Sequence, residues 1–179
     1  MARVRAQLER YEWYRRIFER YRTQVDELLH EAPDIPIRKG RAFYESCPDD
    51  DAVLTFDPYA PQRHSCPKCG KNWTGEKFDG GWVRQFQDWL AKRLVEAGIV
   101  YRVSGGEHYA AFIRACLRHY ADHYREYPLE SNLLGPTRLF QSTYLESFWL
   151  TDLVTAYDLV RAAPCYSDED HAAIRDLFY

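Results

Sequence analysis

Residues 81–103 have the sequence GWVRQFQDWLAKRLVEAGIVYRV, and this stretch decides the class of fold that we expect. Large apolar side chains recur in it at steps of three or four residues. That spacing brings side chains to one face of an α-helix. The stripe consists of Trp82, Phe86, Trp89, Leu90 and Leu94. We therefore predict an amphipathic helix whose apolar face packs against other helices.

The same spacing occurs on both sides of this stretch. Residues 1–31 form a predicted N-terminal amphipathic helix, in which charges of both signs fill the polar face, and Pro33 follows it. Two further helices are predicted over residues 109–124 and 140–160. Short turns between helices favour antiparallel neighbours. The predicted fold class is therefore all-α, built from antiparallel helical hairpins.

Two short polar patterns have the form of a capping box, in which two residues at a helix start bond each other's backbone. Ser104 with Glu107 would open the helix at 109–124, and Ser167 with Asp170 would open a last helix.

Residues 32–80 differ from the rest of the chain. They contain most of the prolines and three consecutive aspartates, and they have no helical period. The stretches AFYESC, at 42–47, and AVLTF, at 52–56, predict two short strands. A loop of this length inside a compact domain needs something to organise it. We therefore divide the chain into residues 1–31, an insert at 32–80, and a helical part at 81–179.

Composition narrows the class of protein. The chain has 179 residues, of which 46% are hydrophobic and 16% aromatic, so it can bury a core. A net charge of -3 gives no basic excess for binding phosphates, and we expect no nucleic-acid partner. No apolar run reaches the roughly 20 residues that span a bilayer, so we expect no membrane partner. The charged N-terminus does not resemble a secretory signal, and localisation is left open.

The insert contains HSCPKCGKNW, residues 64–73. Two thiolates three positions apart on a tight turn can both bind one tetrahedral zinc ion, and the following glycine permits the turn. The predicted cofactor is therefore a structural zinc ion in a knuckle. Its predicted ligands are Cys47, His64, Cys66 and Cys69. Because His64 lies so near Cys66, the carboxylates of Asp49 and Asp50 are alternatives for the fourth position.

Two other interpretations of the CxxC motif stay open. A thioredoxin-like redox pair normally follows a strand and opens a helix, whereas a loop surrounds this motif. A turn without metal would also fit, since the segment has three cysteines rather than four. A catalytic zinc ion is disfavoured because two or three thiolates suit a closed site.

Four stretches, taken in order, resemble the heparinase II/III-like polysaccharide lyases in the N-terminal part of their α/α toroid. The first is SCP at 46–48 followed by FDPYAPQRHSCPKCG at 56–70, and the second is GEKFDGGW at 75–82. The third and fourth are SGGEHYAAFIRACLRHYADHYREYP, at 104–128, and RLFQSTYLESFWLTDLVTAYDLVRAAPCYSDED, at 138–170. The resemblance implies a partial toroid and cleavage of uronic-acid-containing polysaccharides by β-elimination.

In such a reaction a base removes the proton beside the uronate carboxylate, while donors neutralise that carboxylate. The family's catalytic tyrosine and its asparagine or histidine lie further along the toroid, so no catalytic residue is assigned here. The resemblance implies that this chain is a truncated portion, inactive alone, whose partners are an acidic polysaccharide and the remainder of a longer lyase. Members of the family are often periplasmic or secreted.

The predicted helix at 140–160 and the residues just before it offer polar and aromatic side chains for a sugar cleft. Trp149 could stack on a sugar ring and Arg138 could meet a uronate carboxylate. The predicted substrate-binding residues are Arg138, Gln141, Tyr144, Glu146 and Trp149. Two rival functions remain: a non-catalytic carbohydrate-binding helical module, and a zinc-knuckle domain whose helices bind a protein.

Overall fold

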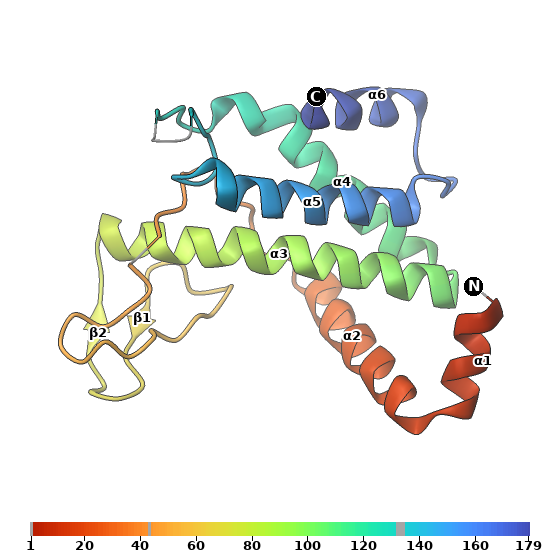
Figure 1. Ribbon diagram of the computed structural model, residues 1–179, viewed down its shortest axis with the longest axis horizontal. Helices are drawn as coiled ribbons and strands as arrows, with labels where there is room; N and C mark the ends of the chain where they lie inside the picture. The colour runs from red at the N-terminus through yellow and green to blue at the C-terminus, as the bar shows by residue number, and fades with distance from the viewer. Residues whose placement is uncertain (1, 43, 132–134) are drawn as a thin grey trace. The chain divides into compact units, whose positions relative to one another are not determined.

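The computed structural model describes residues 2–42, 44–131 and 135–179. Within these residues the chain is mostly helical, which confirms the all-α class (Figure 1). The helices are α1 (Ala2–Arg10), α2 (Glu12–His30), α3 (Glu76–Ser104), α4 (Glu107–His123), the short 3-10 helix η1 (Tyr124–Glu126), α5 (Thr143–Val160) and α6 (Asp168–Phe178). The strands β1 (His64–Ser65) and β2 (Asn72–Trp73) form a small antiparallel sheet.

The chain divides into two compact units, each assembled from segments that are distant in sequence. Unit 1 consists of Met1–Ala32, Ala91–Asp122 and Leu150–Tyr179. Unit 2 consists of Pro33–Leu90 and His123–Trp149. The predicted insert therefore belongs to unit 2, and the predicted N-terminal helix belongs to unit 1 with the last helix.

The predicted N-terminal helix is broken at Tyr11 into α1 and α2. Tyr11 has an extended backbone conformation, with φ -120° and ψ 120°. The Arg15 side chain stabilises the break, because its guanidinium donates to the carbonyl groups of Leu8 and Glu9 at the end of α1, each at 3.3 Å. A helical apolar period alone does not reveal such a break, since the period continues on both sides of it.

Unit 1 packs apolar faces of α2, α4, α6 and the C-terminal parts of α3 and α5. Its fully buried side chains include Val25, Leu94, Ile113, Leu117, Leu153, Val160 and Ile174. Polar contacts join the same helices: Tyr109 on α4 donates to Asp26 on α2 at 2.6 Å, and Arg114 on α4 donates to Asp170 on α6 at 3.3 Å. The unit is therefore a helical bundle with ion pairs at its edges.

One predicted capping box is confirmed and the other differs. Ser167 and Asp170 cap α6 reciprocally, as expected. Ser104 instead ends α3: its hydroxyl donates to the Val100 carbonyl at 2.8 Å and accepts from Gly106 N–H at 3.2 Å. Because α4 begins at Glu107, Ser104 lies too far upstream to be its cap residue.

Unit 2 places the insert beside the N-terminal part of α3. This helix begins at Glu76, six residues before Trp82, the first residue of the predicted apolar stripe, and Glu76 and Asp79 in its first turn favour a helix start. Gly40, Arg41 and Tyr44 lie tightly against this helix: a Cβ added to Gly81 would stand only 2.6 Å from the Tyr44 carbonyl oxygen. Trp82 Nε1 also donates to the Asp57 carbonyl at 2.7 Å.

The two predicted strands of the insert do not form a sheet in the described residues. Ser46 and Val53 make an isolated antiparallel bridge, and Leu54 N–H donates to the Glu45 carbonyl at 2.7 Å. Phe43, within the first predicted strand, lies outside the described residues. The regular sheet is instead β1 with β2, pairing His64 with Trp73.

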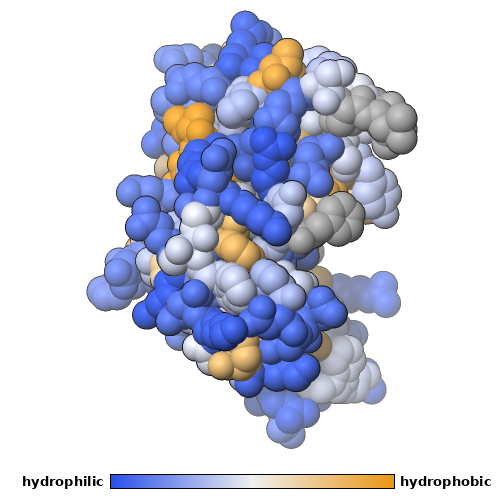
Figure 2. Space-filling view, turned by 90° about the vertical axis from the view of Figure 1, so that its left-hand side faces the viewer, coloured by the Kyte–Doolittle hydropathy of each residue, from blue (hydrophilic) through white to orange (hydrophobic). Residues whose placement is uncertain are grey.

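No helix in the part of the chain that the structure describes is long and apolar enough to cross a membrane. The surface drawn in Figure 2 is largely hydrophilic, with hydrophobic residues in separate small spots.

Candidate metal centre and groove

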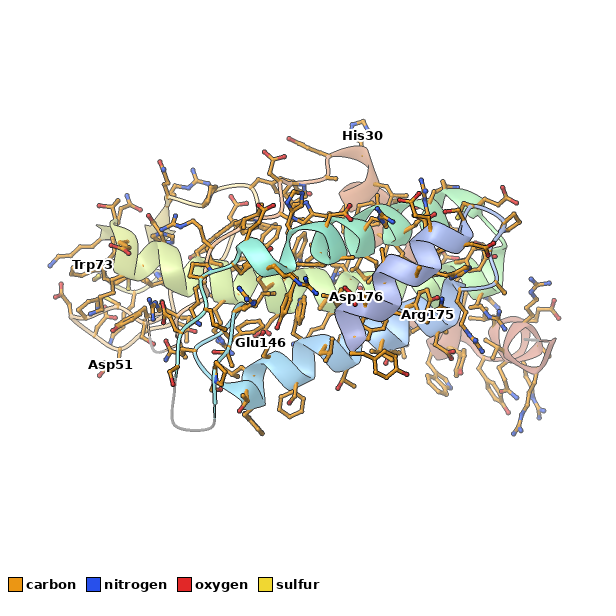
Figure 3. All side chains as sticks on the ribbon, turned by 90° about the horizontal axis from the view of Figure 1, so that it is seen from above. His30, Asp51, Trp73, Glu146, Arg175 and Asp176 are labelled. Carbon is orange, nitrogen blue, oxygen red and sulfur yellow. The ribbon has the colours of Figure 1, made fainter. Side chains whose placement is uncertain are left out.

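Two turns of the insert both begin with Cys-Pro, each preceded by serine, and have the same backbone form. The first is CPDDDA, at 47–52, and the second is CPKCGK, at 66–71. We call them the first and second turn. Figure 3 shows the insert, with Asp51 of the first turn and Trp73 of β2 labelled.

The backbone hydrogen bonds of the two turns correspond one to one. In the first turn Cys47 N–H donates to the Ala52 carbonyl at 2.8 Å, and Asp51 N–H donates back to the Cys47 carbonyl at 2.9 Å. In the second turn Cys66 N–H donates to Lys71 O at 2.8 Å, and Gly70 N–H donates back to Cys66 O at 3.0 Å. The fifth residue of each turn has a left-handed conformation, with φ 58° at Asp51 and 73° at Gly70.

This correspondence places Asp50 where the second turn has Cys69. The carboxylate of Asp50 accepts from Ala52 N–H at 3.0 Å, and the Cys69 sulfur accepts from the equivalent Lys71 N–H. Each turn therefore presents its first and fourth residue: Cys47 and Asp50 from the first, Cys66 and Cys69 from the second.

The four side chains converge. Cys47 Sγ lies 3.7 Å from Cys69 Sγ, and Cys66 Sγ lies 3.4 Å and 3.5 Å from the two carboxylate oxygens of Asp50. One ligand atom from each of the four residues lies within 4.8 Å of the others. Cys47 and Cys66 are buried, whereas Cys69 is exposed. This group can hold a metal ion, and we call it the Cys₃Asp cluster.

The surroundings favour the anionic forms of two of these groups. A hydrogen bond from Ala52 N–H, together with the neighbouring thiols, lowers the pKa of the Asp50 carboxyl. Burial alone would raise the pKa of the Cys66 thiol. The backbone N–H groups of Cys69 and Lys68, each 3.4 Å from its sulfur, bring that pKa below the ordinary value.

Lysines and a very small core surround the cluster. Lys68 Nζ lies 3.5 Å from the Asp50 carbonyl, and the Lys71 ammonium pairs with the Asp49 carboxylate, so positive charge stands beside the cluster. The buried core of the insert is Cys47, Leu54 and Cys66, against which Ala52, Trp73 and Phe78 pack. Two of the three core residues are thus members of the cluster.

His64 lies outside the cluster, unlike the prediction from its sequence position. Its Nε2 lies 2.9 Å from the Asp79 carboxylate of α3, and its ring lies over Phe78 at 6.4 Å between centroids. Asp50, one of the two carboxylates considered as alternatives, takes the fourth position. The sequence contains a signal for this position, because SCPDD aligns with SCPKC and places Asp50 opposite Cys69.

Three predicted substrate-binding residues make hydrogen bonds or ring contacts with other residues of unit 2. Glu146, labelled in Figure 3, is buried in the first turn of α5, where it accepts from the Tyr124 hydroxyl at 2.5 Å and from the backbone N–H groups of Arg138 and Phe140. The Arg138 guanidinium donates to Arg125 O and Tyr127 O, both at 2.9 Å.

Trp149 is the third of these residues. Only 2% of it is exposed, and its ring stacks on Tyr124 at 6.3 Å and 10°. It cannot meet a sugar in this conformation, which departs from the expectation. Trp149 belongs to the apolar stripe of α5, and its side chain fills space in the core instead of facing a ligand.

Gln141 and Tyr144, the other two predicted residues, do line a groove. The groove has a volume of about 520 Å³. Its lining residues are Ala42, Glu45, Arg84, Gln141, Ser142, Tyr144 and Leu145. Sequence reasoning missed Arg84 and Glu45, since they lie 57 and 96 residues before Gln141 and no local pattern links them.

Comparison with known proteins leaves the family open. No model of a protein family matches the chain, and no curated protein matches it significantly.

Proposed function

We propose that this chain is a zinc-stabilised helical module corresponding to the N-terminal toroid portion of a heparinase II/III-like lyase, which binds uronic-acid-containing polysaccharide. The metal centre and the polysaccharide activity depend on different observations and have different tests.

The spacing of the cluster atoms supports the zinc ion. A tetrahedral zinc ion with Zn–S distances of about 2.3 Å separates two sulfur atoms by about 3.8 Å, and a sulfur from a carboxylate oxygen by about 3.5 Å. The Cys47–Cys69 distance is 3.7 Å, and the Cys66–Asp50 distances are 3.4 Å and 3.5 Å. Three thiolates favour zinc over magnesium or calcium, which prefer oxygen ligands.

A structural role fits this ion better than a catalytic one. Four protein ligands close a tetrahedral site, whereas a catalytic zinc ion keeps a position for water. Because the insert has so small a core, the free energy of metal binding would stabilise its folding. The ion would hold the first turn against the second.

Metal analysis of purified protein tests this proposal. We expect one zinc ion per chain in the wild type and loss of it in Cys66→Ser, with a lower melting temperature. Cys116→Ser is the control, because that thiol is buried in α4 outside the cluster. Protein that retains no metal, with Cys66→Ser melting at the wild-type temperature, would refute the zinc proposal.

The lyase proposal is supported by the four stretches of sequence quoted above and by their order along the chain. Antiparallel helices in unit 1 are compatible with hairpins of a toroid. Incubation of the protein with pectate, alginate or hyaluronate tests the activity. We expect it to bind one of these polysaccharides, and an unsaturated uronate product, detected by its ultraviolet absorbance, would identify the lyase.

Four tyrosines of this chain are unsuited to act as the base in β-elimination. Burial, first of all, raises the pKa of Tyr109, Tyr124, Tyr127 and Tyr166. A tyrosine that acts as the base in β-elimination needs the opposite shift. Polysaccharide binding without any unsaturated product would identify the non-catalytic module, and binding of a protein that is lost on chelation would identify the other rival.

A further inference from the structure

The groove of unit 2 brings together three segments that are far apart in sequence. Ala42 and Glu45 come from the segment before the first turn, Arg84 comes from α3, and Gln141, Tyr144 and their neighbours come from the start of α5. Its volume of about 520 Å³ lies within the range of small-molecule sites.

The charge of the Arg84 guanidinium is balanced within the groove. Its Nη1 donates to Glu45 Oε1 at 2.7 Å, and its Nη2 lies 3.3 Å from the Asp88 carboxylate. The positive charge of Arg84 is therefore already paired and is not free to bind a carboxylate ligand. The oxygen and nitrogen atoms of the Arg84–Glu45 pair can still bond uncharged hydroxyl groups.

Two aromatic rings stand exposed at the same end of α5. Tyr144 is 62% exposed and Phe148 is 54% exposed, and their rings meet edge to face at 4.7 Å. Large aromatic side chains are normally buried, and an exposed pair beside a groove is a feature of a contact surface. The flat apolar face of a sugar ring can pack on such a ring, while its hydroxyl groups reach the polar atoms.

The Gln141 amide completes the set. It lines the groove next to Tyr144 and offers both a donor and an acceptor. A stacking ring, an amide and a balanced Arg–carboxylate pair together suit a ligand that has an apolar face and many uncharged hydroxyls.

We infer that this groove binds an uncharged sugar unit of a polysaccharide, stacked on Tyr144 and hydrogen-bonded by Gln141 and the Arg84–Glu45 pair. The inference rests on the proposed polysaccharide function and deepens it. In this proposal the uncharged sugar unit of the polysaccharide occupies the groove, and the carboxylates of its uronate units bind elsewhere on the protein.

Titration of the isotope-labelled protein with three tetrasaccharides tests the inference. The probes are a neutral hexose tetramer, a neutral N-acetylhexosamine tetramer and tetragalacturonate, followed through backbone amide shifts. We expect at least one neutral tetramer to shift the amides of Arg84, Gln141 and Tyr144. In Tyr144→Ala and Gln141→Ala its Kd should rise at least about tenfold, which corresponds to about 1.4 kcal/mol.

Tyr59→Ala is the matched control. Tyr59 is an exposed tyrosine of the same unit, at 46%, and it does not line this groove. The inference is overturned if neither neutral tetramer shifts these amides, if only tetragalacturonate does, or if Tyr59→Ala weakens binding as much as Tyr144→Ala.

The elimination assay on the same preparations separates this inference from the proposed function. Neutral sugar binding without unsaturated product would retain the groove and reject the lyase. Unsaturated product formed at equal rates by Tyr144→Ala and the wild type, with no neutral sugar bound, would retain the lyase and reject the groove.

Discussion

Asp50 and Cys69 occupy the same position in two turns that share one backbone form. Each is the fourth residue of its turn, and each accepts the N–H of the residue two positions later. A carboxylate thus stands where a symmetrical site would have a fourth thiolate. Because carboxylate is a harder ligand than thiolate, we expect it to weaken zinc binding relative to a Cys₄ site.

Substitution of Asp50 tests this relationship. Asp50→Ala should lower the zinc affinity at least about tenfold, because it removes one ligand. Asp50→Cys should raise the affinity above that of the wild type, because it restores the symmetrical set. Competition with a chromophoric chelator measures both. Asp49→Ala is the control, since Asp49 pairs with Lys71 and not with the thiols. Equal affinities for Asp50→Ala and Asp49→Ala would exclude Asp50 as a ligand.

Metal removal should loosen the two turns and leave unit 1 unchanged. The amides of Asp51 and Gly70 close the turns by donating to Cys47 and Cys66. After chelation we expect these amides to exchange with deuterium at least about tenfold faster, because local opening no longer breaks metal–ligand bonds. The amide of Ile113, in the core of unit 1, is the internal reference. Unchanged exchange at Asp51 and Gly70 would show that the turns close without metal.

The sequence predicted the helices well because an apolar period is a local property. Residues 109–124 and 140–160 correspond closely to α4 and α5, and Ser167 was correctly placed as the cap of α6. The break at Tyr11 has no Gly or Pro to announce it. It depends on Arg15 reaching the carbonyl groups at the end of α1, which is a property of the folded chain.

The candidate site was predicted only in part, for a similar reason. Cys66 and Cys69 were found because CxxC is a local motif, and Cys47 was added because it is the other cysteine of the insert. Asp50 was predicted only as an alternative to His64, since preferring it requires comparison of two turns 19 residues apart. Trp149 has the kind of aromatic ring on which sugars stack, but it lies in the core against Tyr124. Arg84 reaches the groove only because α3 packs on Gly40 and Glu45, and no local pattern contains that contact.

Replacement of Glu146 should destabilise unit 2 strongly. Its buried carboxylate accepts from Tyr124 and from two backbone N–H groups, so Glu146→Ala leaves three donors without this acceptor. We expect a loss of about 3 kcal/mol in the free energy of unfolding, and about half of that for Glu146→Gln, which keeps one carbonyl oxygen. Urea unfolding measures both.

Glu169→Ala is the control for this change, since that side chain is 83% exposed. It should alter stability by no more than about 0.5 kcal/mol. A Glu146→Ala protein as stable as this control would show that Glu146 is not the acceptor that organises residues 138–140.

Stability should fall at high pH partly through Tyr109. Burial, and then its hydrogen bond to Asp26, raises the pKa of Tyr109 to about 12, from an ordinary value of 10.0. The folded state holds this proton more tightly than the unfolded state. The contribution of the Tyr109 hydroxyl to the free energy of unfolding is therefore fully present below pH 10 and is lost as the pH rises through about 12.

Tyr109→Phe removes the titrating group and isolates this contribution. Urea unfolding between pH 9 and pH 12 should show a smaller loss of stability for Tyr109→Phe than for the wild type. Tyr144→Phe, at an exposed position, should keep the wild-type slope. Identical slopes for Tyr109→Phe and the wild type would contradict the prediction.

The close approach of α3 and α5 in unit 1 depends on Gly98. A Cβ added there would lie 2.8 Å from Leu159 Cδ1 and 2.9 Å from Leu159 Cβ, closer than packed carbon atoms come. Gly98→Val should therefore cost about 1–3 kcal/mol in the free energy of unfolding, as overpacked cores do. In a Leu159→Ala background the same change should cost less, because the Cγ and Cδ atoms of the opposing side chain are gone and only its Cβ remains. A double-mutant cycle by urea unfolding measures the coupling, and equal costs in both backgrounds would show that the helices separate freely.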